Sequence, residues 1–82
     1  MSKILLAEDD TDMRRFLVKA LQNAGFDVTS YDNGLSAYQR LREESYELLL
    51  TDIVMPEMDG IELARRDCEL DPDIKIKFIT GF

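Results

Sequence analysis

Histidine is absent from the 82 residues of the chain, and cysteine occurs once. Without histidine the chain lacks the commonest general base and the commonest zinc ligand, so any catalysis has to use carboxylates and hydroxyls. A lone cysteine excludes an internal disulfide and fits a reducing cytoplasm, which is the location we predict. We expect that residue, Cys68, to lie in the core or at its boundary on a helix.

Basic residues and long hydrophobic runs are also scarce. Lys and Arg number 10 against 17 Asp and Glu, which gives a net charge of −7 without any basic run. This balance argues against nucleic-acid binding by this segment, because phosphate contacts need a basic face, and it favours basic protein partners. The N-terminal apolar run is too short for a signal peptide or a membrane span, so we expect no membrane association. The length predicts one domain, residues 1–82, of modest stability.

Two acidic clusters each follow a short apolar run. Residues 48–60 read LLLTDIVMPEMDG and residues 4–10 read ILLAEDD. Apolar runs of this length are typical of strands buried on both faces of a parallel sheet, which would leave Asp52 at a carboxyl end. If the two strands are neighbours, their carboxylates converge in one crevice. Clustered carboxylates repel one another, and no nearby residue type supplies a positive charge, so the pattern predicts a divalent metal.

The remaining pattern alternates between strands and helices. We predict strands at residues 3–7, 26–31, 48–51 and 74–80, with helices at 11–24, 35–44 and about 60–69. Asp10 or Thr11 can cap the first helix and Asp59 the third, with Glu62 reaching back toward it. Short loops between such elements predict an α/β fold with a doubly wound parallel sheet.

The apolar spacing predicts which side of each helix faces the core. The first helix carries one apolar stripe that includes Met13 and Phe16. For the later helices the predicted inward residues are Leu35, Tyr38 and Leu41, then Ile61, Ala64 and Cys68.

The three motifs ILLAEDD, LLLTDIVMPEMDG and FITG (residues 78–81) occur in this order along the chain. In their residues and spacing the chain resembles the receiver domains of two-component response regulators, and within them the stand-alone regulators of the CpdR type. The resemblance implies a flavodoxin-like sheet with strand order 2-1-3-4. Receivers have five βα units, so we expect the fifth to be absent, together with the lysine that ends its strand.

The resemblance also implies roles for particular residues. Asp52 would be the phosphoryl acceptor, and the hydroxyl of Thr80 would bind the phosphoryl group. Glu8 and Asp9 would hold Mg²⁺ together with Asp52 and the backbone carbonyl of Val54, since magnesium takes oxygen ligands and keeps several waters. Asp10 would then be a helix cap.

Two other chemistries meet contradictions in the sequence. An EF-hand loop starting at the first acidic cluster would need glycine where Met13 stands and a bidentate acid where Lys19 stands. A haloacid-dehalogenase-type phosphatase would need a second aspartate two residues after Asp52, where the chain has Val54.

The function implied is a signalling switch. A histidine kinase or histidine phosphotransfer protein would donate the phosphoryl group from its own phosphohistidine, and the switch would act on a downstream protein target. Enzymatic activity would be limited to the domain's own phosphorylation and dephosphorylation. The alternative is an adaptor that binds its partner whatever its phosphorylation state and keeps the acidic pocket as a structural or metal-binding element.

The last predicted strand carries one further expectation. Without a fifth unit it would lie at the edge of the sheet with unpaired backbone groups, and Ile76 or Phe78 and part of the first helix would face water. We therefore expect two copies of the chain to pair through this edge as a homodimer.

Overall fold

The computed structural model describes residues 2–79. Strands and helices alternate as predicted, and their bounds are β1 (Lys3–Ala7), α1 (Thr11–Asn23), β2 (Asp27–Tyr31), α2 (Gly34–Glu43), β3 (Leu48–Asp52), α3 (Gly60–Leu70) and β4 (Lys75–Ile79). All four strands are parallel and lie in the order β2-β1-β3-β4, which confirms the predicted fold and strand order. No helix in this described part is long and apolar enough to cross a membrane.

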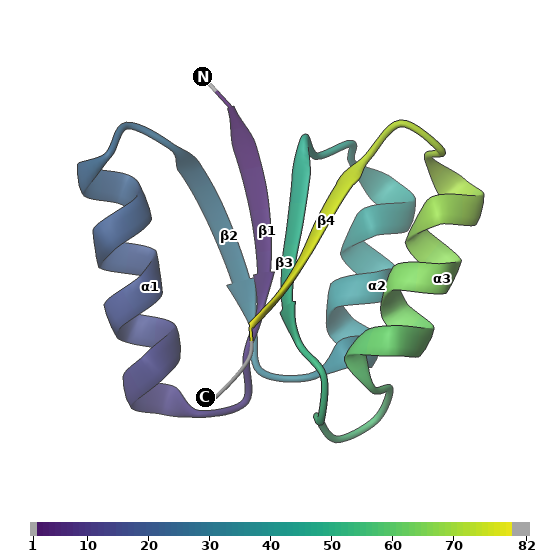
Figure 1. Ribbon diagram of the computed structural model, residues 1–82, viewed down its shortest axis with the longest axis horizontal. Helices are drawn as coiled ribbons and strands as arrows, with labels where there is room; N and C mark the ends of the chain where they lie inside the picture. The colour runs from purple at the N-terminus through teal and green to yellow at the C-terminus, as the bar shows by residue number, and fades with distance from the viewer. Residues whose placement is uncertain (1, 80–82) are drawn as a thin grey trace.

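The sheet is covered unequally on its two faces. Figure 1 shows α1 alone on one face and α2 beside α3 on the other. The core lies on the side of α2 and α3, where Leu5, Leu49 and Leu63 are fully buried. On the α1 side, Leu50 remains half-buried. The prediction that β3 is buried on both faces was therefore too strong, because a single helix does not cover this width of sheet.

Two helices begin at the predicted caps. The Met13 N–H donates to Asp10 Oδ1 at 2.9 Å, and the Glu62 N–H donates to Asp59 Oδ1 at 2.8 Å. Each bond satisfies one free N–H of a first turn. The expected return contact from Glu62 is absent from the hydrogen bonds of the described residues, where its carboxylate instead accepts from Arg65 and Arg66.

The inward face of α3 differs from the prediction. Ala64 is buried, as predicted, but Ile61 is 54% exposed and Cys68 is exposed. Leu63 and Asp67 are buried instead of these two residues. The prediction followed the apolar residues, but the buried side of this helix contains a carboxylate. The placement of Cys68 in the core or at its boundary was wrong for the same reason.

The inward face of α2 was predicted with one error. Leu41 is buried and Tyr38 packs partly against the core, as expected, but Leu35 is 38% exposed. Ala37 and Gly34 are buried in its place. Two small residues bring α2 close to the rest of the molecule, and a pattern search for large apolar residues passes over them.

The apolar stripe of α1 faces solvent over much of its length. None of the residues of α1 is buried, and Phe16 is 67% exposed. On β4, Phe78 is 39% exposed, as expected, while Ile76 packs partly against the core.

Candidate active site

The predicted acidic residues come together at the carboxyl edge of the sheet. Glu8 and Asp9 directly follow β1, Asp52 is the last residue of β3, and these two strands are neighbours. One carboxylate oxygen from each of the three residues lies within 4.8 Å of the others. Such a set of oxygens is the kind of ligand group that Mg²⁺ prefers. The predicted convergence is confirmed by this geometry.

The three carboxylates differ in exposure and in their bonds. Glu8 is only 3% exposed, Asp52 is half-buried and Asp9 is exposed. The Asp10 N–H donates to Glu8 Oε2 at 3.2 Å, and the Ile53 N–H donates to Asp52 Oδ1 at 2.8 Å. One oxygen of Asp52 is thus held by the backbone, which fixes the direction in which its second oxygen points.

Burial and the neighbouring carboxylates together alter the pKa of Glu8, the buried member of the cluster. Burial, together with the hydrogen bond and charge of Asp52, raises the pKa of Glu8 to about 7, against the lowering effect of the bond from the Asp10 N–H. Glu8 is therefore partly protonated near neutral pH. A divalent cation among these oxygens would stabilise the ionised form and displace that proton.

One basic residue lies closer to this site than the sequence indicated. Arg14, on the first turns of α1, donates from Nη1 to the backbone oxygen of Glu8 at 2.9 Å. Its bond is to a carbonyl, and among the described residues no basic group forms an ion pair with the three carboxylates. The cluster therefore keeps its negative charge. Helical spacing does not indicate this contact, because Glu8 lies before the N-cap of α1.

The loop of residues 53–59 is held under the site by two glycines. A Cβ on Gly60 would lie 1.9 Å from the backbone oxygen of Asp52, and a Cβ on Gly34 would lie 1.9 Å from the backbone oxygen of Met58. The Gly60 N–H donates to the oxygen of Ile53 at 2.7 Å and closes the loop. Close backbone approach of this kind requires glycine. Gly60 thereby lets α3 lie against the end of β3 at Asp52, and Gly34 lets α2 lie against the loop at Met58.

Strain is present in the same loop. Glu57 has φ 75, in the left-handed region that residues with a Cβ rarely adopt. Such strain is tolerated where surrounding contacts fix the backbone, and it gathers at functional loops.

The structure does not test the roles predicted for Val54 and Thr80. Val54 is 78% exposed and lies in the loop directly after Asp52, so its carbonyl as a metal ligand stays a prediction. Thr80 lies outside the described residues. Asp10, expected to be a cap, is confirmed as the N-cap of α1.

Comparison with known proteins places this geometry in a family. Residues 4–82 match the family described as response regulator receiver domain. The chain is 76% identical over its whole length to the response regulator receiver protein CpdR of Brucella abortus (strain 2308) and spans 68% of that protein. It is 48% identical over 62 residues to the transcriptional regulatory protein CpxR homolog of Haemophilus influenzae, covering 76% of this chain and 27% of that protein.

Solved structures agree with the sequence comparison. The response regulator TrrA from Thermotoga maritima, in complex with Mg²⁺ and BeF, superposes with a TM-score of 0.94 at 30% identity, over 100% of this chain and 71% of that one. A structure of TrrA in complex with the histidine kinase ThkA gives a TM-score of 0.90 at 30% identity, with the same coverage. This chain therefore belongs to the response regulator receiver domain family of two-component systems.

Proposed function

We propose that this domain takes a phosphoryl group from a phosphohistidine onto Asp52 and thereby switches a protein–protein interaction. The observation that carries the proposal is the approach of the oxygens of Glu8, Asp9 and Asp52 to within 4.8 Å of one another at one edge of the sheet. Asp52 presents one oxygen that the Ile53 N–H does not engage. A carboxylate oriented in this way can act as a nucleophile toward phosphorus.

The transfer can be written with this chain's own atoms. The second carboxylate oxygen of Asp52 attacks phosphorus, a new P–O bond forms, and the bond between phosphorus and the donor's imidazole nitrogen breaks. The electron pair of that bond stays on the imidazole, which then takes a proton. The donor histidine has to come from a partner, because this chain has none.

Mg²⁺ is the cofactor that the acidic group fits. Glu8, Asp9 and Asp52 would hold it, with the carbonyl of Val54 as a further oxygen ligand, since magnesium is usually bound by few carboxylates. When bound, it neutralises negative charge on the phosphoryl oxygens. The complex of TrrA with Mg²⁺ and BeF supports this assignment by similarity.

The proposed partners follow from the same comparisons. TrrA has been solved with the histidine kinase ThkA, which supports a histidine kinase or phosphotransfer protein as the donor for this domain. Four further features stay predictions: a downstream protein target, a role for Thr80, a cytoplasmic location and the pairing of two copies through β4. For pairing, sedimentation at increasing concentration is the measurement, since β4 is the edge of the described sheet.

Chemical mapping of the modified residue tests the function. The protein is incubated with acetyl phosphate and Mg²⁺, the acyl phosphate is reduced with borohydride, and the resulting homoserine is located by peptide mass spectrometry. We expect homoserine at position 52 in the sample with Mg²⁺ and none in a sample with chelator. Modification at another carboxylate, or modification that ignores the chelator, would contradict the proposal.

Magnesium is expected to stabilise the fold. Bound cation removes the repulsion among the three carboxylates, so millimolar Mg²⁺ should raise the melting temperature. The increase should be larger at pH 8 than at pH 6, because Glu8, whose pKa is raised to about 7, has to lose its proton on binding. Thermal unfolding followed by circular dichroism measures the increase in melting temperature at each pH. A melting temperature that Mg²⁺ does not change at pH 8 would contradict the metal site.

Substitutions at positions 9 and 10 should separate ligand from cap. Asp9→Ala is expected to abolish the response to Mg²⁺. Asp10→Ala removes the N-cap of α1 and should cost about 1 kcal/mol of stability while keeping the response. The same magnesium titration on both variants decides the assignment, and the reverse pattern would show that the acidic pair is Asp10 with Glu8.

A further inference from the structure

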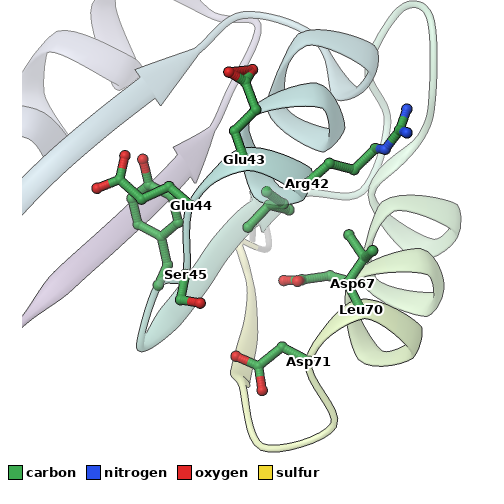
Figure 2. A pocket seen from close by; sticks show the side chains of 9 residues that line it. Arg42, Glu43, Glu44, Ser45, Asp67, Leu70 and Asp71 are labelled. Atoms are coloured by element: carbon green, nitrogen blue, oxygen red, sulfur yellow. The ribbon is translucent and has the colours of Figure 1, made fainter.

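A second polar cavity lies at the opposite end of the sheet from Asp52. It has a volume of about 190 Å³ and is bounded by the C-terminal ends of α2 and α3 and by residues 44–46. Figure 2 shows the carboxylates of Asp67 and Asp71 directed from the side of α3 into the space before Ser45. None of these residues takes part in the acidic site described above.

Asp67 is the unusual member of this group. Its side chain is 1% exposed, and its Oδ2 atom has no hydrogen-bond partner among the described residues. A buried carboxylate oxygen without a partner is costly, and in folded proteins such groups are normally bonded. The exception calls for a group that the described residues do not provide.

The surroundings favour a positively charged occupant. Asp71 adds a second carboxylate, and the last residues of α2, which form the negative end of the helix dipole, line this cavity. Burial first, and then the charge of Asp71, raises the pKa of Asp67 to about 6. A cation beside Asp67 would lower this pKa and stabilise the ionised carboxylate.

The nearby basic residues of the described chain are directed elsewhere. Figure 2 shows the Arg42 side chain pointing away from Asp67, and its guanidinium carbon lies 6.0 Å from the centre of the Tyr38 ring. Lys3 and Arg40 form ion pairs with Glu44. The remaining acid at the cavity, Glu43, points away from its centre in the same view.

The shape and chemistry of the walls select the kind of cation. The described residues contain one group of three or more carboxylates close enough to hold a metal, and it is the site at Asp52 rather than this one. Here the oxygens of two carboxylates and of the Ser45 hydroxyl stand beside Leu41 and Leu70. An alkylammonium group matches this combination, because its methylenes pack on leucine while its three N–H groups donate to oxygens. The cavity volume is below the roughly 300–1,000 Å³ of common ligand pockets, so the occupant has to be as small as a short alkylammonium group.

We infer that this cavity, with Asp67 and Asp71 as acceptors, is a binding site for an alkylammonium group. Two sources share this chemistry: a lysine side chain of a partner protein and a free small amine. In both cases the ammonium donates the hydrogen bond that Asp67 Oδ2 does not receive from the described residues.

The test is a titration of the protein with n-butylammonium and with Nα-acetyl-lysine amide, followed by heteronuclear NMR at pH 8. We expect shifts that saturate, centred on residues 43–46, 67 and 71, with either probe. Saturation with both probes shows that the cavity accepts a lysine side chain, and saturation with butylammonium alone restricts the site to a free amine. If neither saturates, or if neutral n-butanol gives the same shifts, the inference is overturned.

Variants decide whether the carboxylates carry the binding. Asp67→Asn, which keeps the shape and removes the charge, is expected to weaken butylammonium binding by at least about tenfold. Arg42→Ala should bind as tightly as the parent or more tightly, because it removes a like charge beside the cavity. Binding that survives Asp67→Asn unchanged, or that is lost in Arg42→Ala, contradicts the site.

Proton competition provides an independent measurement on the unaltered protein. Because the pKa of Asp67 is about 6, lowering the pH from 8 to 5 should weaken binding by roughly tenfold, whereas an alkylamine stays charged throughout. The other titratable and charged groups that line the cavity are Arg42, Glu43, Glu44, Tyr46 and Asp71. An affinity independent of pH over this interval would overturn the role of Asp67.

Discussion

Asp52→Asn is expected to abolish the gain of a phosphoryl group from acetyl phosphate and Mg²⁺, as measured by intact mass. An amide oxygen is a poor nucleophile and the substitution removes one of the three metal ligands, so both requirements of transfer are lost together. The side chain keeps its size and can still accept the bond from the Ile53 N–H. Loss of modification would therefore reflect chemistry rather than a changed loop.

Asp10→Asn is the matched control for this substitution. It removes the same charge within the same acidic region, and asparagine is as good an N-cap as aspartate. We expect this variant to be modified like the parent. A phosphoryl gain in Asp52→Asn equal to that in Asp10→Asn would show that Asp52 is not the phosphoryl acceptor.

Asp52→Asn should also change how the stability of the protein depends on pH in the absence of metal. The folded-state pKa of Glu8 is raised to about 7 from an ordinary 4.5. An acid with a raised folded pKa costs stability above that pKa and costs nothing below its unfolded pKa, so the parent should become more stable as the pH falls from 8 to 5. Asp52→Asn removes a charge that raises this pKa, and its stability should therefore vary less over the interval in chemical denaturation.

Much of this architecture follows from local rules that a sequence displays. The apolar runs before Glu8 and Asp52 predict buried strands, and parallel pairing brings their ends to one edge. Asp10 and Asp59 stand where capping chemistry places them, and both caps are confirmed. The order of strands, by contrast, came from the family resemblance, because alternation alone does not rank four parallel strands.

The errors have a common physical origin. Helix faces were predicted from large apolar side chains, and Ile61 and Leu35 were placed inward on that basis, although both are exposed. The rotation of α3 is set instead by Gly60, which has to face the backbone of Asp52, and it carries Asp67 into the interior. A pattern search for amphipathic stripes gives no weight to glycine and reads a carboxylate as outward. For the same reason the cavity at Asp67 had no signal in the sequence.

The importance of Gly60 leads to the second large effect that we expect. Gly60→Ala should destabilise the protein by about 3 kcal/mol or more, because the new methyl group would stand 1.9 Å from the Asp52 oxygen and 3.1 Å from the Ile53 Cα. Both neighbours are backbone atoms, so relief requires α3 to move away from β3. That movement would break the 2.7 Å bond from the Gly60 N–H to the Ile53 oxygen.

The sign of this effect separates close packing from helix propensity. Gly60 is the first residue of α3, where alanine in open space would be favoured over glycine by up to about 1 kcal/mol. Gly25→Ala is the control, since its Cβ would meet nothing within 4 Å and its cost of about 1 to 2 kcal/mol arises from the positive φ alone. Urea unfolding should therefore rank the parent above Gly25→Ala and Gly25→Ala above Gly60→Ala. Under native conditions Gly60→Ala should also slow modification by acetyl phosphate, because the displaced loop carries Asp52, whereas Gly25→Ala should leave the rate unchanged.

A Gly60→Ala protein as stable as the parent would contradict this prediction. It would mean that a Cβ at position 60 has more room than the 1.9 Å to the Asp52 oxygen indicates, and that close contact with Gly60 does not position Asp52.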